Sequence, residues 1–328
     1  MPSPFDPSVR LHVVTGKGGT GKTVVAAALA LALAEVGRRV LLVEVEGRQS
    51  LAPVLGVAPL AYEERVLPHT VGGGRVSGQA VDAESALLEY LELFYALGRS
   101  GRALRRAGAL ALITTIAPGA RDQLLAGKVY EAVRRRGADG SYAYDAVVLD
   151  APPTGRIARF LTVSGEVAAL ASRGPIGGQA ASVLELLRSP ATAVHLVTLL
   201  EEMPAQETRD AAAELRAAGL PLGALVVNRV RAPLLPPPAL LAAADDGLDA
   251  AEIAAGLRAA GLNDGEATLV ALLQEAAEHA RRALAEQAER AALDALEVPV
   301  HELPLLHSGV DPEGLQVLAG LLRERVAA

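Results

Sequence analysis

The stretch "TGKGGTGKTVV", residues 15–25, is the most specific indication of fold in this 328-residue chain. Its centre, "GKGGTGKT" at 16–23, satisfies the phosphate-binding pattern G-x-x-x-x-G-K-[ST]. The apolar run "LHVVT" at 11–15 precedes it, and the alanine-rich run "TVVAAALALALAEVG" follows it. A strand, a glycine loop and a helix in this order are the context in which the pattern binds phosphate, so we predict a P-loop.

Each residue type in the loop has a chemical reason. Glycines let backbone N–H groups converge on phosphate oxygens, and the start of the following helix adds a favourable dipole. Lys22 is expected to reach the β- and γ-phosphates of a nucleotide, and the Thr23 hydroxyl is expected to ligate Mg²⁺. The predicted nucleotide-binding residues of the loop are Gly16, Lys17, Gly18, Gly19, Thr20, Gly21, Lys22 and Thr23.

Short valine-rich runs alternate with long helical patterns along the chain. The runs are apolar at consecutive positions, as expected for parallel strands that are covered on both faces. They occupy residues 11–15, 40–45, 146–150, 193–199, 224–228 and 300–304, and helical patterns occupy 21–36, 83–98, 119–136 and 204–218. This alternation predicts an α/β fold with a doubly wound, mostly parallel sheet.

Two regions contain more helix than a crossover between strands needs. They span about 84–136 and 235–297, and the second opens with "LPPPALL" and continues as charged, alanine-rich helix. We expect both to be helical insertions on one P-loop domain that spans residues 1–328.

Two carboxylates follow predicted strands. Asp150 ends the strand at 146–150, which places it at the carboxyl edge of the sheet, where open α/β sheets bind ligands. We expect Asp150 to take part in the Mg²⁺ shell and the following "APPTG" to act as a nucleotide-sensitive loop. Glu44 and Glu46 share a face by period two, and Glu46 is placed to orient or activate the attacking water. The alternative for Glu46 is a solvated acidic strand end.

Composition excludes several classes of function. The chain has no cysteine, so disulfides and thiolate metal sites are absent, and its net charge of −7 argues against binding nucleic acid. No signal peptide is visible, and the longest apolar run, at 24–34, is shorter than the ~20 residues that span a bilayer. We therefore expect a soluble, cytoplasmic protein without a transmembrane segment.

Some residues have competing interpretations. The six histidines lack metal-ligand spacing, and His12 and His195 fall in strand patterns, so we expect them in the core. The basic segment "GRSGRALRRAG" at 98–108 is either a solvated helix face or a docking face for lipid head groups or an acidic partner. The amphipathic C-terminus favours a docked helix over a peripheral membrane contact.

The residues also resemble a known family. A lysine directly after the first glycine is the deviant Walker A form of the class of MinD, ParA, the nitrogenase iron protein and ArsA. Within it, the chain most resembles ArsA and the guided-entry ATPase for tail-anchored proteins. The matching stretches are "DAPPTGRIARFL" (150–161), "LLEEMPAQETRDAAAEL" (199–215), "VVNRV" (226–230) and "LPLLHSGVDPEGL" (303–315). "VEVEGRQSLAPVLG" and "LFYALGRSGRALRRAG" look closer still to the ArsA-like ATPases of high-GC Gram-positive bacteria, which often occur as adjacent paralogues.

The resemblance implies roles for further residues. Lys17 would reach the phosphates bound to the other protomer of a face-to-face dimer, whereas Lys22 would serve its own nucleotide. Asn228 would read the adenine, and Pro304 would make the other contact with the base. The implied cofactors are ATP and Mg²⁺, and the implied partners are a second protomer, identical or paralogous, and a client that the sequence does not identify.

The chain also departs from the family. The residue aligned with the family's catalytic Asp is Glu46, followed by Gly47, Arg48 and Gln49, so turnover is expected to be slow or to depend on the partner. The absence of cysteine excludes the thiolate arsenite site and the zinc-clamped dimer, and Met203 is the only internal methionine, unlike a methionine-rich client groove. Neither arsenite transport nor tail-anchor targeting is therefore implied.

The function predicted from the sequence is that of a Mg²⁺-dependent ATPase that switches a dimer between closed and open arrangements. One alternative is a catalytically weak ATP-binding module of a heteromeric complex. Another is a positioning ATPase of the ParA or MinD kind, against which the acidic net charge argues where DNA is the track.

Overall fold

The computed structural model describes residues 6–45, 49–68, 73–95, 119–170, 175–307 and 309–326. Their strands form one sheet in the order β3-β4-β2-β5-β1-β6-β7-β8. The bounds are β1 Leu11–Gly16, β2 Arg39–Val45, β3 Arg65–Val66, β4 Arg75–Val81, β5 Ala146–Asp150, β6 Thr192–Thr198, β7 Leu222–Val230 and β8 Val300–Pro304. All neighbours are parallel except β3 and β4. The predicted α/β sheet is confirmed, and β3 and β4 are additions to it.

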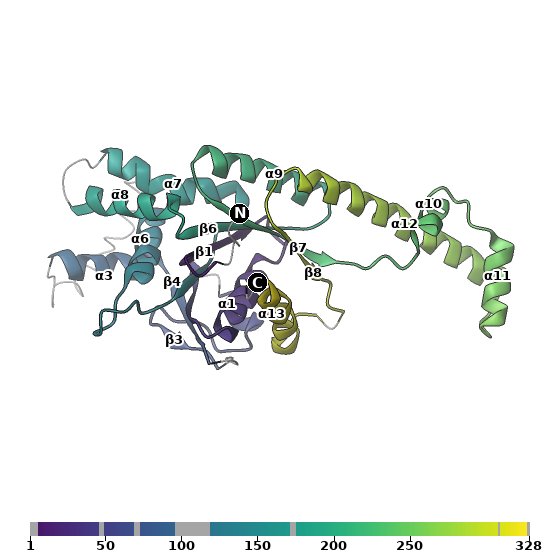
Figure 1. Ribbon diagram of the computed structural model, residues 1–328, viewed down its shortest axis with the longest axis horizontal. Coiled ribbons are helices and arrows are strands. Elements are labelled where there is room, and N and C mark those ends of the chain that lie inside the picture. Colours follow the sequence, from purple (N-terminus) through teal and green to yellow (C-terminus); the bar gives the residue numbers. More distant parts are fainter. Residues whose placement is uncertain are drawn as a thin grey trace.

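One face of the sheet is covered by α1 (Lys22–Glu35) and α13 (Pro312–Val326), which pack against each other (Figure 1). α1 consists largely of alanine and leucine, which have the highest helix propensities, and every residue from Val25 to Ala34 is buried. Leu315 and Leu322 of α13 belong to the same core cluster. The C-terminal segment is thus a docked helix, as the sequence predicts.

The opposite face carries a second helical layer. Its helices are α6 (Ala120–Arg134), α7 (Thr154–Leu170), α8 (Pro175–Arg188) and α9 (Glu202–Ala217). Leu125 and Val129 of α6 share a core cluster with Val147 and Leu149 of β5. The short α2 (Leu51–Val54) lies between β2 and β3 in the chain, and α3 (Ala83–Tyr95) follows β4.

The first expected insertion is therefore described in part. α6 and all but the first residue of α3 fall within residues 84–136, and α6 buries apolar side chains in the core of the sheet's second face. Residues 96–118, with the basic segment at 98–108, lie outside the described residues.

The second expected insertion forms a helical arm, which we define as α10 (Pro237–Ala244), α11 (Ala250–Ala259) and α12 (Glu266–Asp294). α12 runs from the edge of the sheet outward, α10 packs against the middle of α12, and α11 lies at its far end (Figure 1). At 29 residues, α12 is about 44 Å long. α11 buries none of its residues. Among the described residues, no helix is both long and apolar enough to cross a bilayer.

Two buried histidines, His12 on β1 and His195 on β6, link these neighbouring strands. His195 Nδ1 accepts a hydrogen bond from Ala224 N at 3.0 Å, so the ring proton of the neutral imidazole lies on Nε2 and is donated to His12 Nδ1 at 3.1 Å. Burial lowers the pKa of His195 to about 3. Burial, followed by the charges of His195 and Arg38, lowers the pKa of His12 well below its ordinary value. Both rings are core residues, as expected.

Candidate nucleotide-binding site

The glycine loop connects the end of β1 to the start of α1 and depends on two glycines for its shape. A Cβ on Gly16 would lie 2.2 Å from the carbonyl oxygen of Val197, so the backbone there leaves no room for a side chain. Gly21 adopts φ +88°, and a Cβ on it would lie 2.4 Å from Asn228 Nδ2. These contacts fix the loop against β6 and β7, with its backbone at the carboxyl edge of the sheet.

Thr23 and Asp150 meet directly beside the loop. The Thr23 hydroxyl donates to Asp150 Oδ2 at 2.8 Å, and Asp150 is 4% exposed. β5 lies next to β1, with Asp150 opposite Val14. Oxygen donors of this kind suit Mg²⁺, which binds through one or two protein oxygens while the nucleotide and water supply the rest. No group of three or more His, Asp or Glu that could hold a metal is found in the described part of the chain, so this pair is not part of a preformed metal cage.

The two loop lysines have different surroundings. Lys22, the first residue of α1, is buried, whereas the side chain of Lys17 is 29% exposed. Lys17 Nζ forms an ion pair of 2.7 Å with Glu207 Oε1 on α9 of the same chain. Partly exposed ion pairs contribute roughly 0–1 kcal/mol, so this contact can be exchanged for a stronger one.

The β2 end of the site is held by Glu44. Glu44 is 1% exposed, and its Oε1 accepts hydrogen bonds from Ser50 N and Ser50 Oγ, both at 2.6 Å. The bonds tie the end of β2 to the start of α2. Glu46, the residue predicted to position water, lies outside the described residues with Gly47 and Arg48, so its role stays a prediction.

Asn228 connects the loop with a small pocket. Its Nδ2 donates to Thr20 O at 2.8 Å, and its Oδ1 accepts from Arg229 N at 2.9 Å. An amide group can donate two hydrogen bonds and accept two, so one of each remains for a ligand. This capacity matches a purine edge. Pro304 lies opposite Val230 in the β7–β8 ladder, two residues beyond Asn228 along β7.

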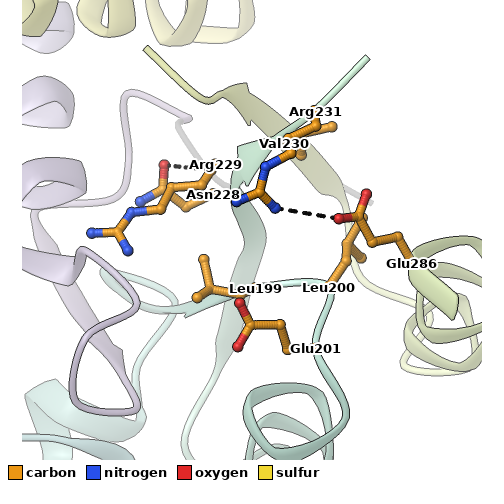
Figure 2. A pocket seen from close by; sticks show the side chains of 8 residues that line it. All are labelled: Leu199, Leu200, Glu201, Asn228, Arg229, Val230, Arg231 and Glu286. Carbon is orange, nitrogen blue, oxygen red and sulfur yellow. Dashed lines mark hydrogen bonds and ion pairs between the residues drawn. The ribbon is translucent and has the colours of Figure 1, made fainter. Parts of the chain in front are cut away.

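The pocket beside Asn228 is shared between the sheet and the arm. Figure 2 shows its lining: Leu199, Leu200, Glu201, Asn228, Arg229, Val230, Arg231 and Glu286. Leucine and valine side chains suit the faces of a planar base, whereas the carboxylates, guanidinium groups and amide can pair with its edge. Glu286 belongs to α12, and its Oε1 lies 3.4 Å from Arg231 Nη1. One wall of the pocket therefore belongs to the arm.

Comparison with known proteins shows the family to which the chain belongs. The family model described as "Anion-transporting ATPase" (ArsA ATPase) matches residues 9–173, which include the glycine loop, Thr23 and Asp150. ATPase BagA of Mycobacterium tuberculosis is 50% identical over 317 residues, covering 97% of this chain and 93% of that protein. The chain belongs to the ArsA ATPase family.

More distant relatives match about half of this chain. A Chlorobaculum tepidum protein, whose provisional name describes an arsenical pump-driving ATPase, is 31% identical over 159 residues, 47% of this chain and 36% of its own length. ATPase get3 of Schizosaccharomyces japonicus is 27% identical over 154 residues, 47% of this chain and 44% of its own. The resemblance seen in the motifs is confirmed, and ATPase chemistry is the activity that the family supports.

The structure brings together most of the residues that the sequence selected. The glycine loop, Thr23 and Asp150 meet at one edge, and Asn228 contacts the loop. Two residues in this neighbourhood, Glu44 and Glu207, were not among the predicted site residues. A charged residue inside the otherwise apolar run "VLLVEV" was the available signal for Glu44. The Lys17–Glu207 contact depends on how α9 packs and left no local signal.

Proposed function

We propose that this chain is a Mg²⁺-dependent ATPase that works as a nucleotide-switched dimer, with itself or with a paralogous subunit, and couples ATP to a client. The observation that supports it most is the Thr23–Asp150 hydrogen bond of 2.8 Å directly beside a phosphate-binding loop. A nucleotide-bound Mg²⁺ needs two protein oxygens, and this hydrogen bond places both of them beside the element that binds phosphates.

In this proposal each residue has one task. The loop amides and Lys22 bind the β- and γ-phosphates, and Thr23 and Asp150 hold Mg²⁺. The ion would neutralise charge that develops on the phosphate oxygens. Glu46 orients a water for attack on the γ-phosphorus, and the bond to the ADP oxygen breaks, leaving ADP and inorganic phosphate. Asn228 and Pro304 contact the base.

The role proposed for Lys17 requires a dimer. Its ammonium group, which contacts Glu207 in this chain, would exchange that carboxylate for the phosphates of the nucleotide on the other protomer. A cation delivered across an interface stabilises the transition state as an arginine finger does. Closure of the dimer would then be coupled to hydrolysis.

The contribution of Glu46 separates an enzyme from a binding module. Glu46→Gln keeps the size of the side chain but removes its charge, so we expect phosphate release to fall at least ~100-fold, within the range of general-base contributions, while ATP still binds. The measurement is single-turnover phosphate release at saturating ATP. Unchanged release would favour a module in which ATP has a structural role.

The arm is the element that we expect to respond to the nucleotide. α12 contacts the pocket through Arg231–Glu286, contacts α9 through Arg209–Glu289 at 3.3 Å, and contacts β8 through Arg290–Glu302. ATP should change hydrogen–deuterium exchange in residues 237–294. Tripolyphosphate, which can fill the glycine loop but not the base pocket, should change it much less.

A pair of variants controls this prediction. Glu286→Ala removes the arm's contact with the pocket, so ATP should bind but alter exchange in the arm less. Glu278→Ala, at an exposed position on the same helix, should respond as the unmodified chain does. An equal response to tripolyphosphate and ATP, or a full response in Glu286→Ala, would show that the base pocket does not transmit the signal.

A further inference from the structure

Glu44 lies at the metal-binding edge of the sheet without an assigned role. It is the penultimate residue of β2, and its Cα is paired with that of Asp150 in the β2–β5 ladder. Neighbouring strands lie about 4.8 Å apart, so the two carboxylate residues are adjacent. Glu44 is also one of the most deeply buried charged residues, with 1% of its surface exposed.

The side chains of Glu44 and Asp150 project from the same face of the sheet. Leu42 and Val148, two residues earlier on each strand, belong to the core cluster formed with α1. Side chains alternate along a strand, so Glu44 and Asp150 point to the α1 face as well. α1 supplies Thr23, which donates to Asp150 Oδ2. Glu44 is therefore next to the Thr23–Asp150 pair.

The two carboxylate oxygens of Glu44 are used unequally. Oε1 accepts both hydrogen bonds from Ser50, whereas Oε2 is buried and has no hydrogen-bond partner among the described residues. A buried charged oxygen without a hydrogen-bond donor destabilises the fold. Such an oxygen, beside a second carboxylate and a hydroxyl, is suited to accept a hydrogen bond from a metal-bound water.

We propose that Glu44 is a second carboxylate of the Mg²⁺ site and that its Oε2 holds a water bound to the ion that Thr23 and Asp150 ligate. This inference rests on the proposed function. Mg²⁺ retains several waters in proteins, and groups that hold such waters tune its affinity. Since Oε1 holds Ser50, the same side chain connects the ion to the segment between β2 and α2, in which Glu46 lies.

The test measures metal affinity rather than turnover. Mn²⁺ replaces Mg²⁺ as the probe, and its binding to the protein–ADP complex is followed by electron paramagnetic resonance. Glu44→Gln keeps the shape but cannot offer a carboxylate, so Mn²⁺ affinity should fall about tenfold or more, as for other second-layer groups. ADP affinity in EDTA should stay within about twofold of the unmodified chain's, because no phosphate contact is removed.

Ser50→Ala is the matched control. It removes one donor to Oε1 and leaves the Glu44 carboxylate, so Mn²⁺ affinity should be nearly unchanged. Equal Mn²⁺ affinity in Glu44→Gln and the unmodified chain overturns the proposal, as does an equal loss in Ser50→Ala, which would assign Glu44 to anchoring the segment. An unmodified chain that binds no Mn²⁺–ADP overturns the proposed function itself.

Discussion

Replacing Lys17 by alanine is expected to slow ATP hydrolysis at least ~100-fold while ATP affinity changes less than about threefold, since cations delivered across an interface contribute 10³–10⁵ in rate. The reason is that Lys17 contacts Glu207 in its own chain, whereas the proposal assigns nucleotide and metal binding in that chain to Lys22, Thr23 and Asp150. Its loss removes a contact made during reaction and leaves the binding loop intact. Phosphate release and calorimetric ATP binding measure the two effects separately.

Lys22→Ala is the control for this experiment. Lys22 is the phosphate-binding lysine in the proposal, so its loss should reduce ATP affinity and hydrolysis together. Equal loss of binding and hydrolysis in Lys17→Ala would rule out a role across the dimer interface.

Mixing two defective chains extends the test if the dimer is formed by identical protomers. A mixed dimer of Lys17→Ala and Glu46→Gln contains one complete site, which combines Glu46 of the first chain with Lys17 of the second. Half of the dimers in an equal mixture are mixed, and one of their two sites works, so activity should recover to about a quarter of the original. No recovery would indicate that Lys17 acts within its own chain.

Acidification is expected to destabilise the fold steeply, because His12 and His195 are buried in neutral form. The unfolded chain binds a proton on each ring below a pKa of about 6.5, whereas the folded chain does not until the pKa of His195, about 3, is approached. The unfolded state therefore binds more protons, and stability is lost as pH falls from 6.5 towards 3. His195 alone should lower the free energy of unfolding by about 2 kcal/mol between pH 6.5 and 4.5, and His12 should add to this loss.

Urea unfolding at a series of pH values measures this loss. The charge of Arg38 disfavours a positive charge on His12, and that of His301 disfavours one on His195. In His195→Gln the amide can still accept a hydrogen bond from Ala224 N and donate one to His12. Because the amide does not bind a proton, the slope of the unfolding free energy against pH should fall by about 1.4 kcal/mol per pH unit. His307→Gln, at an exposed position, should keep the original slope. An unchanged slope in His195→Gln would contradict the neutral pair.

The sheet was largely predictable because most of its strands are buried on both faces and read as apolar runs. β4 was missed for a physical reason. Its sequence, "RVSGQAV", carries Ser77, Gly78 and Gln79, which do not resemble a buried strand, yet Ser77 and Gln79 are buried. Gln79 Nε2 donates to Tyr62 O at 2.7 Å, and this tertiary contact, which the local sequence pattern does not reveal, satisfies the buried amide N–H.

Those parts of the nucleotide-binding site that lie in one continuous segment, or at the end of one strand, were predictable from the sequence. The glycine loop is contiguous, and Asp150 was placed by the rule that parallel strands end at one edge. Contacts between distant segments were not predictable from local patterns. Lys17 and Glu207 are 190 residues apart and meet only because α9 packs beside the loop, and Glu286 reaches the pocket only through the course of α12.

Calorimetric titration of the purified chain with ATP, alone and together with a paralogous subunit, in the presence and absence of Mg²⁺, is the most direct test of Mg²⁺-dependent ATP binding. We expect ATP binding that strengthens when Mg²⁺ is present, because Thr23 and Asp150 meet beside the phosphate loop. Absence of Mg²⁺-dependent ATP binding in both samples would contradict it.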